Sequence, residues 1–309
     1  MKYRELGKTG LRVSELSYGA AALGDVYGTI DQATGIRAVH TAVAHGINLI
    51  DVSPYYGETR AETVLGKALQ EIPRDRYYLS TKLGRYGLNN FDFSPARVKA
   101  SIEESLARLH IDYVDLLFVH DVEFASLDYI VAETLPALEK VRASGKARFI
   151  GISGLPLKIF RYVLERAPLD VILSYCHYNL QNSALADLIP FLKSKGVGIL
   201  NAAPTAMGLL TKQGPQPWHL AQPEIKRACA QAAAYCTARG ANIVQLAIQF
   251  AIANPDIAST IVGSADPREI ETDIEWADTP IDSQLLADVE RILAPIHNLI
   301  WQSGRPENN

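Results

Sequence analysis

The sequence contains little cysteine, no long apolar run and no excess of charge of either sign. Its 309 residues include only three cysteines, Cys176, Cys229 and Cys236, with no C-x-x-C spacing. An odd number of cysteines without that spacing argues against a disulfide framework and against a structural zinc site. The apolar runs are as long as strands and fall well short of the roughly 20 residues that a membrane-spanning helix needs. We therefore expect an ordinary globular protein with no membrane segment.

The charges give no sign of a nucleic-acid partner. Thirty Lys and Arg residues stand against 34 Asp and Glu residues, for a formal net charge of −4, and both signs are interspersed along the chain. Such a chain offers no basic stripe to a phosphate backbone. The segment Met1–Leu6 also lacks the apolar core of a signal peptide. We expect a cytoplasmic protein that binds no nucleic acid.

Short apolar segments typical of strands alternate with longer segments of helical periodicity. We expect eight strands, at Glu15–Gly19, Asn48–Val52, Tyr77–Lys82, Tyr113–His120, Ala147–Ser153, Val171–Tyr175, Gly198–Ala202 and Ser259–Val262. The helices carry clear boundary signals, such as Ser94-Pro95 before Ala96–Leu109, Gly145 after Leu127–Ser144 and Gly196 after Ala184–Lys195. Eight alternating units predict parallel strands joined by right-handed crossovers.

This α/β pattern predicts a (β/α)8 TIM barrel formed by a single domain over residues 1–309. A doubly wound sheet is the alternative, but it would place G-x-G-x-x-G after the first strand, where the chain has Ala20–Gly24. Two short extended runs around Gly7–Gly10 predict an N-terminal β-hairpin. Ile243–Ala253 and Ser283–Leu293 predict extra C-terminal helices beyond the eight units.

Polar side chains end four consecutive strands of the predicted barrel, at the rim where such barrels build their active sites. Asp51 lies at the end of the second strand and Tyr56 follows it, Lys82 ends the third, His120 ends the fourth and Ser153 ends the fifth. A tyrosine has a pKa of about 10, too high for efficient proton exchange at neutral pH. An ammonium about 4 Å away would stabilise the phenolate by roughly 4 kcal/mol, so we expect Lys82 to bring the pKa of Tyr56 near neutral pH.

Asp51 and His120 complete an acid/base system with Tyr56 and Lys82. Asp51 would keep Lys82 charged, and His120 would orient a substrate oxygen beside the phenol. A proton handled at an oxygen next to an unreactive carbon suggests hydride transfer, which requires a nicotinamide cofactor. Cys176 and His177 are adjacent, and alternation along a strand puts them on opposite faces, so we expect no metal site.

Four segments together resemble the aldo-keto reductases: Arg4–Leu11, Asp51–Gly57, Thr81-Lys82 and Ile261–Ser264. The resemblance covers nearly the whole chain. It implies a monomer or weak homo-oligomer that binds a nicotinamide cofactor across the C-terminal rim of the barrel. It also implies that Asp51, Tyr56, Lys82 and His120 are the catalytic residues, with Tyr56 transferring the proton.

The resemblance further implies where the cofactor lies. Ser153 would contact the nicotinamide carboxamide, and the turn with Met207, Gly208 and Leu209 would lie near the pyrophosphate. The adenosine half would lie along Gly263–Asp273, which includes Ser264, Asp266, Glu269 and Asp273. Tyr175 stands where the family often has a glutamine, and either a face stacked on the nicotinamide or a buried core side chain fits this position.

The cofactor is expected to be NAD rather than NADP. Reductases of this family that prefer NADP place a basic residue against its 2′-phosphate after the eighth strand, where this chain has Glu269 and, nearby, Asp266. Carboxylates repel a phosphate and accept hydrogen bonds from a ribose hydroxyl. A shift of one residue would instead put Arg268 at the phosphate and reverse the preference.

Within the family, the resemblance favours oxidation of an aldose at C1, with L-galactose or a related sugar such as L-fucose as substrate and a lactone as product. Tyr56 would accept the proton and His120 would hold the oxygen. Asp121 follows His120 and is a candidate for a sugar hydroxyl, although a pairing with Arg85 is equally compatible with its position. The alternatives are an NADPH-dependent carbonyl reductase, a pyridoxal-type alcohol dehydrogenase and a regulatory subunit that senses the cofactor.

Overall fold

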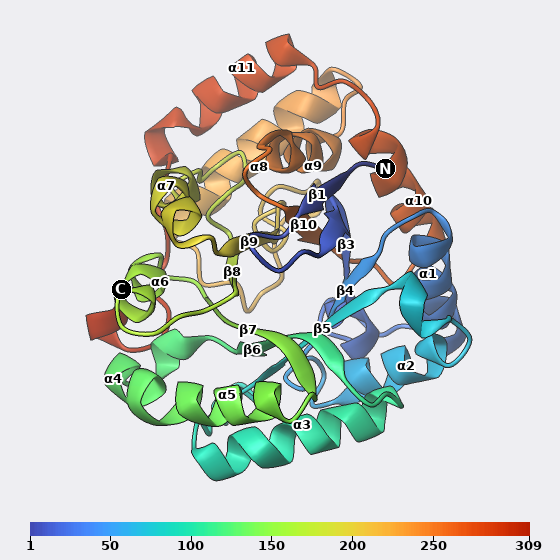
Figure 1. Ribbon diagram of the computed structural model, residues 1–309. Helices are drawn as coiled ribbons and strands as arrows, with labels where there is room; N and C mark the ends of the chain where they lie inside the picture. The colour runs from blue at the N-terminus through green and yellow to red at the C-terminus, as the bar shows by residue number, and fades with distance from the viewer.

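A computed structural model describes the whole chain, residues 1–309, and shows eight parallel strands closed into a barrel (Figure 1). Around the barrel the strands follow one another in chain order, and β10 returns to pair with β3. The strands are β3 (Leu16–Gly19), β4 (Leu49–Asp51), β5 (Tyr78–Leu83), β6 (Val114–Val119), β7 (Ala147–Gly154), β8 (Val171–Tyr175), β9 (Gly198–Ala202) and β10 (Ser259–Val262). The predicted (β/α)8 fold is confirmed, and no predicted strand end is displaced by more than one residue.

A ring of helices covers the outside of the barrel (Figure 1). These helices are α1 (Gln32–Ala44), α2 (Arg60–Leu69), α3 (Pro95–Leu109), α5 (Leu135–Ala143), α6 (Lys158–Leu164), α7 (Leu185–Lys195), α9 (Ile243–Ala253) and α10 (Pro267–Ala277). Two further helices, α8 (Pro223–Ala238) and α11 (Ser283–Leu293), pack against each other outside the ring. The segment Ile243–Ala253, expected as a helix beyond the eight units, is α9, which packs against β10. The connection from β9 to β10 contains both α8 and α9, so α8 is its extra helix.

Local sequence signals set the helix ends. The hydroxyl of Ser94 accepts a hydrogen bond from the backbone N–H of Arg97 at 3.3 Å, and Pro95 opens α3. Gly196 ends α7 with a φ of 69°, in the left-handed region that glycine adopts readily. The predicted helix Leu127–Ser144 contains a wide turn at Ile130–Thr134, between α4 (Leu127–Tyr129) and α5. Pro136 follows this turn and has no N–H for the regular helical hydrogen bond.

The predicted hairpin is formed by β1 (Tyr3–Glu5) and β2 (Arg12–Ser14) and lies across one end of the barrel (Figure 1). Its side chains Leu6, Leu11 and Val13 are buried in one cluster with interior residues of the barrel such as Phe118. The turn fits closely, since a Cβ at Gly7 would lie 2.3 Å from the backbone nitrogen of Gly198 at the start of β9. The hairpin thus closes the N-terminal end and leaves the C-terminal rim open to ligands.

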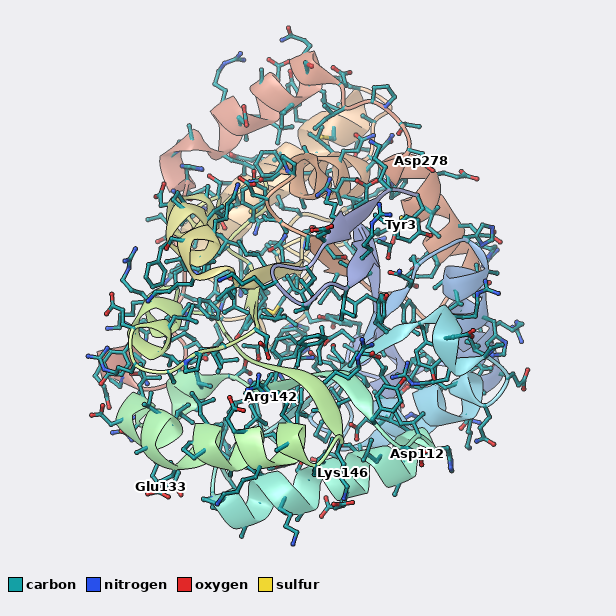
Figure 2. All side chains as sticks on the ribbon, viewed as in Figure 1. Tyr3, Asp112, Glu133, Arg142, Lys146 and Asp278 are labelled. Carbon is teal, nitrogen blue, oxygen red and sulfur yellow. The ribbon has the colours of Figure 1, made fainter.

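Charged side chains of both signs cover the outside of the helical ring, with Asp112, Glu133 and Asp278 exposed among them (Figure 2). None of the helices combines the length and the apolar character that crossing a membrane requires.

The C-terminal segment Trp301–Asn309 folds back onto the C-terminal rim of the barrel. There Asn308 is buried and donates hydrogen bonds to the carbonyls of Glu123 and Ala125.

Candidate active site

The four polar residues expected at the strand ends meet at the C-terminal rim. Asp51 ends β4, Lys82 lies near the end of β5, and His120 follows β6 directly. Tyr56 lies on the turn after β4. Because neighbouring strands are parallel, their last residues share one rim, and the side chains of Asp51, Lys82 and His120 are almost completely buried there.

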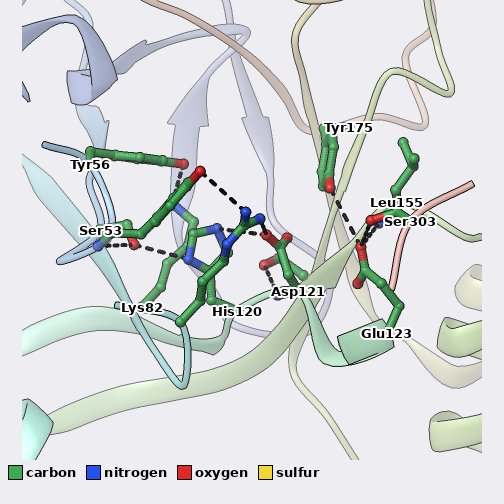
Figure 3. Close-up of polar contacts among 12 residues, drawn as sticks. Ser53, Tyr56, Lys82, His120, Asp121, Glu123, Leu155, Tyr175 and Ser303 are labelled. Atoms are coloured by element: carbon green, nitrogen blue, oxygen red, sulfur yellow. Dashed lines mark hydrogen bonds and ion pairs between the residues drawn. The ribbon is translucent and has the colours of Figure 1, made fainter. Parts of the chain in front are cut away.

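The ammonium of Lys82 makes three hydrogen bonds inside the barrel. It donates to Oδ2 of Asp51 at 2.6 Å, to the carbonyl of Val52 at 2.9 Å and to the hydroxyl of Tyr56 at 3.1 Å. The second carboxylate oxygen of Asp51 accepts a hydrogen bond from the hydroxyl of Ser80 at 2.5 Å. All three donors of Lys82 therefore have acceptors, and the phenol lies directly beside a cation (Figure 3).

The pKa of Tyr56 does not follow the expectation from the sequence. Burial raises the pKa of Tyr56 well above its ordinary value, and the charges of Asp51 and Asp121 raise it further. The expected lowering assumed an isolated ammonium beside the phenol, whereas Asp51 neutralises Lys82 at 2.6 Å. Tyr56 is thus a protonated phenol at neutral pH, with an ammonium in place to stabilise its oxygen once the proton leaves.

His120 lies beside the phenol, and its ring is perpendicular to that of Tyr56, at 86° and 5.9 Å between centroids. Burial, together with the charges of Lys82 and Arg85, lowers the pKa of His120 well below its ordinary value. The imidazole is therefore neutral at physiological pH and carries one proton. Its Nδ1 lies 3.0 Å from the hydroxyl of Ser53, a contact that the sequence analysis did not anticipate.

A second buried ion pair borders this group. Arg85 donates to Oδ2 of Asp121 at 2.5 Å, and its guanidinium lies over the ring of Tyr55 at 4.0 Å. Burial alone would lower the pKa of Arg85, but the Asp121 carboxylate raises it. Of the two roles considered for Asp121, the structure forms the pairing with Arg85, while Oδ1 of Asp121 has no hydrogen-bond partner.

Glu123 is a buried carboxyl group that the sequence analysis missed. One of its oxygens accepts hydrogen bonds from the backbone N–H of Leu155 at 3.1 Å and from the hydroxyl of Ser303 at 3.0 Å (Figure 3). The hydroxyl of Tyr175 approaches the same oxygen at 3.5 Å. Burial and the charge of Asp121 raise the pKa of Glu123 to about 8. Glu123 thereby connects the rim to the C-terminal segment of the chain.

The residues expected at the nicotinamide half of a cofactor occupy the same rim. Ser153 is buried near the end of β7, where its hydroxyl accepts a hydrogen bond from the backbone N–H of Asp121 at 3.3 Å. Tyr175 is partly buried at the end of β8, with its hydroxyl toward Glu123.

The turn expected at the pyrophosphate follows β9. Its backbone is left-handed at Met207 and Gly208, with φ values of 52° and 98°. The side chain of Leu209 is buried in the cluster between this turn and α8, so only the backbone of Leu209 can serve a ligand there.

A cavity of about 390 Å³ lies beside the residues expected at the adenosine half. Its lining includes Gly263, Ser264, Asp266 and Glu269 from one side and the loop Tyr27–Asp31 from the other. These groups fit the ribose end of a dinucleotide, because carboxylates accept hydrogen bonds from hydroxyls. They also repel a phosphate, because like charges at short range destabilise each other.

The neighbouring charged residues offset part of that repulsion. Arg268 does not line the cavity, but it pairs with Asp266 at 2.9 Å and so balances that carboxylate, with its own side chain 86% exposed. Asp273 does not line the cavity, and burial together with the charge of Glu269 raises its pKa to about 7. No three His, Cys, Asp or Glu side chains are grouped so that they could hold a metal ion.

Comparison with known proteins gives consistent matches over the whole chain. The sequence profile of the aldo/keto reductase family matches residues 15–294. The chain is 50% identical to an L-galactose dehydrogenase of Arabidopsis thaliana over 317 aligned positions, which cover 100% of this chain and 99% of that one. It is 32% identical to a D-arabinose 1-dehydrogenase of Saccharomyces cerevisiae, with 95% of each chain covered. An aldo-keto reductase of Bacillus halodurans, solved in its holo form, shares the fold with a TM-score of 0.79 at 24% identity, over 99% of each chain.

The raised pKa of Glu123 makes a prediction about stability. A carboxyl group whose pKa rises to about 8 on folding binds its proton more tightly in the folded chain than in the unfolded one. Stability therefore falls as pH rises from about 4.5 to about 8, and this loss is complete above that range. The variant Glu123→Gln keeps a neutral side chain of the same shape. We measure the melting temperature of Glu123→Gln minus that of the wild type at about pH 6 and at about pH 9. We expect this difference to be larger at about pH 9 by about 3 °C or more.

Glu133→Gln is the matched control, because Glu133 is exposed and forms no ion pair. Its melting temperature should follow that of the wild type at both pH values. If the melting temperatures of Glu123→Gln and the wild type change equally between the two pH values, Glu123 is already ionised in the folded chain at the lower pH.

Proposed function

Because this chain belongs to the aldo/keto reductase family of oxidoreductases, we propose that it oxidises a neutral aldose at C1 to the lactone, with NAD as the cofactor. The proposed substrate is L-galactose or a related sugar such as L-fucose. The observation that carries the proposal is the contact of Tyr56 with Lys82 at 3.1 Å, in a chain that is 50% identical over its full length to an L-galactose dehydrogenase. The D-arabinose 1-dehydrogenase also acts on a sugar, by its name, which supports an aldose as the class of substrate.

Three side chains carry the proposed proton transfer. The ionised phenol oxygen of Tyr56 accepts the proton of the C1 hydroxyl and becomes a neutral hydroxyl, and Lys82 stabilises the phenolate beforehand by its hydrogen bond. The ring of His120 lies 5.9 Å from that of Tyr56 between centroids, and His120 holds the substrate oxygen beside the phenol. A bound nicotinamide supplies the acceptor for the hydride that leaves C1. The proton and the hydride together account for the two hydrogens removed from the sugar.

The charges around these side chains support a neutral substrate. Lys82 is balanced by Asp51, and Arg85 is balanced by Asp121. A buried site without net charge gives no compensation for the desolvation of a charged ligand, whereas it provides donors and acceptors for hydroxyl groups. Oδ1 of Asp121 lacks a hydrogen-bond partner, and we assign it to a hydroxyl of the sugar.

The cofactor would lie along the rim in the arrangement that the family resemblance implies. Ser153 and Tyr175 would hold the nicotinamide half, and Met207, Gly208 and Leu209 would contact the pyrophosphate. The adenosine ribose would lie in the cavity beside Ser264, Asp266 and Glu269. Arg268 balances Asp266, so the carboxylate of Glu269, which forms no ion pair, is the group that favours NAD over NADP.

The proposed function is tested with purified protein and a panel of substrates. Reduction of NAD is followed by absorbance with L-galactose, L-fucose, D-arabinose and D-glucose, and NADP is tested beside NAD. We expect saturable turnover with NAD and at least one of the first two sugars. Activity confined to simple aldehydes with NADPH would replace the proposal by a carbonyl reductase. Cofactor binding without turnover of any sugar, aldehyde or pyridoxine would replace it by a sensor.

The raised pKa of Tyr56 predicts the pH dependence of the oxidation. The proton acceptor is the ionised phenol, and its fraction rises about tenfold per pH unit below the pKa. We therefore expect kcat/KM for sugar oxidation to rise about 100-fold from about pH 7 to about pH 9, which is about tenfold for each pH unit. His120, whose pKa is lowered, contributes no titration in this range.

Tyr56→Phe should lower kcat at least about 100-fold and abolish the rise with pH, while circular dichroism shows an unchanged fold. A folded Tyr56→Phe variant with near-normal turnover would rule out Tyr56 as the proton acceptor.

The preference for NAD is tested at Glu269. Glu269→Arg replaces a carboxylate that lines the cavity by a cation, so we expect the ratio of kcat/KM with NAD to that with NADP to fall at least about tenfold. Glu271→Arg makes the same change of charge at an exposed position of α10 that does not line the cavity. An equal effect of both substitutions, or none, would contradict a contact between Glu269 and the ribose.

A further inference from the structure

Ser53 connects the two proton-handling residues of the site. It is completely buried, two residues after Asp51. Its hydroxyl oxygen accepts a hydrogen bond from the backbone N–H of Tyr55 at 3.1 Å and lies 3.0 Å from Nδ1 of His120. Its backbone carbonyl accepts a hydrogen bond from the N–H of Tyr56 at 3.1 Å. One residue thus contacts both the turn that carries Tyr56 and the ring of His120.

The donor between Ser53 and His120 follows from the hydrogen bonds available. The backbone N–H of Tyr55 already donates to the hydroxyl oxygen, so Ser53 still has its own proton to place. Nδ1 of His120 is the only acceptor within hydrogen-bond distance of that hydroxyl. If Nδ1 carried the proton, the buried hydroxyl of Ser53 would have no acceptor, which costs about 1–3 kcal/mol. The hydroxyl therefore donates, and Nδ1 accepts.

The opposite side of the imidazole leads to the same tautomer. Nε2 faces Oδ2 of Asp121 at 3.6 Å, and Arg85 fixes that carboxylate in place. A carboxylate near a ring nitrogen favours the form in which that nitrogen carries the proton. The hydrogen bond made by one imidazole nitrogen determines the protonation of the other. Ser53 and Asp121 therefore both favour a proton on Nε2.

We propose that Ser53 is a positioning residue that holds neutral His120 in the tautomer with its proton on Nε2. In this form Nε2 can donate a hydrogen bond to the substrate oxygen. The other tautomer would present a lone pair to that oxygen and repel it. The inference rests on the proposed function for the identity of the substrate, but the tautomer itself is a property of the protein alone.

The test uses three variants of the full chain. Ser53→Ala removes the hydroxyl, and Ser53→Thr retains one at the same position. Ser101→Ala is the matched control, since Ser101 is also a completely buried serine, but its hydroxyl makes no hydrogen bond and it lies on α3, away from the site. The tautomer of His120 is determined from ¹⁵N resonances of the imidazole nitrogens, assigned by comparison with His120→Asn. In parallel, kcat is measured with NAD and L-galactose, with a C1-deuterated substrate to establish that hydride transfer limits the rate.

In the wild type we expect a protonated Nε2 and an unprotonated Nδ1. In Ser53→Ala we expect resonances averaged between the two tautomers and a kcat lower by about tenfold, the effect of about one hydrogen bond. The affinity for NAD, followed by quenching of protein fluorescence, should stay unchanged. Ser53→Thr should restore both the tautomer and most of kcat, and Ser101→Ala should match the wild type.

The proposal is overturned if wild-type His120 carries its proton on Nδ1, or if a folded Ser53→Ala variant keeps both the wild-type tautomer and the wild-type kcat. Should Ser53→Ala not fold, the wild-type spectrum and Ser53→Thr still decide between the two tautomers. If the wild type oxidises no aldose, the proposed function fails, whereas the resonances of His120 still test the role of Ser53.

Discussion

The burial of one ammonium group determines the arrangement of the whole site. Lys82 is 1% exposed, and an uncompensated charge at such a position would cost several kcal/mol. The register of β4 and β5 provides the compensation, because Asp51 is paired with Ser80 and Lys82 lies two residues further on the same face of β5. Asp51 therefore meets both side chains inside the barrel. The third donor of Lys82 is left for Tyr56, and so a requirement of folding places a cation beside a phenol.

The same compensation limits what Lys82 does to Tyr56. Because Asp51 neutralises the ammonium, the phenol experiences a dipole rather than a free positive charge, and burial controls its pKa. The pattern is repeated on the other side of His120, where Asp121 balances Arg85. Strong local fields thus exist around Tyr56 and His120, although the two neighbouring ion pairs carry no net charge. These groups can orient the hydroxyl groups of a neutral ligand without attracting a charged substrate.

The fold and the meeting of Asp51, Tyr56, Lys82 and His120 could be predicted, because strand periodicity identifies parallel strands and parallel strands end at one rim. The pKa of Tyr56 could not, because burial depends on packing that a sequence does not display. Glu123 escaped notice for a similar reason, since Ser303 is 180 residues away along the chain. Ser53 did leave a local signal, as a serine hydroxyl often accepts the N–H two residues later and so marks a turn. The sequence could not decide whether Asp121 pairs with Arg85, because that depends on how the loops after β5 and β6 pack together.

The backbone around Tyr56 leaves the phenol and the imidazole of His120 little freedom to move. The turn that carries Tyr56 packs against the loop after β3 so closely that a Cβ at Gly57 would lie 2.2 Å from the carbonyl oxygen of Gly24. Gly57 also has a φ of 62°, where only glycine is free of strain. On the opposite side, Asp121 adopts a φ of 52° directly after His120. Because the backbone fixes the chain on both sides of Tyr56 and His120, folding sets the relative position of the two rings. Ligand binding then does not have to bring them together.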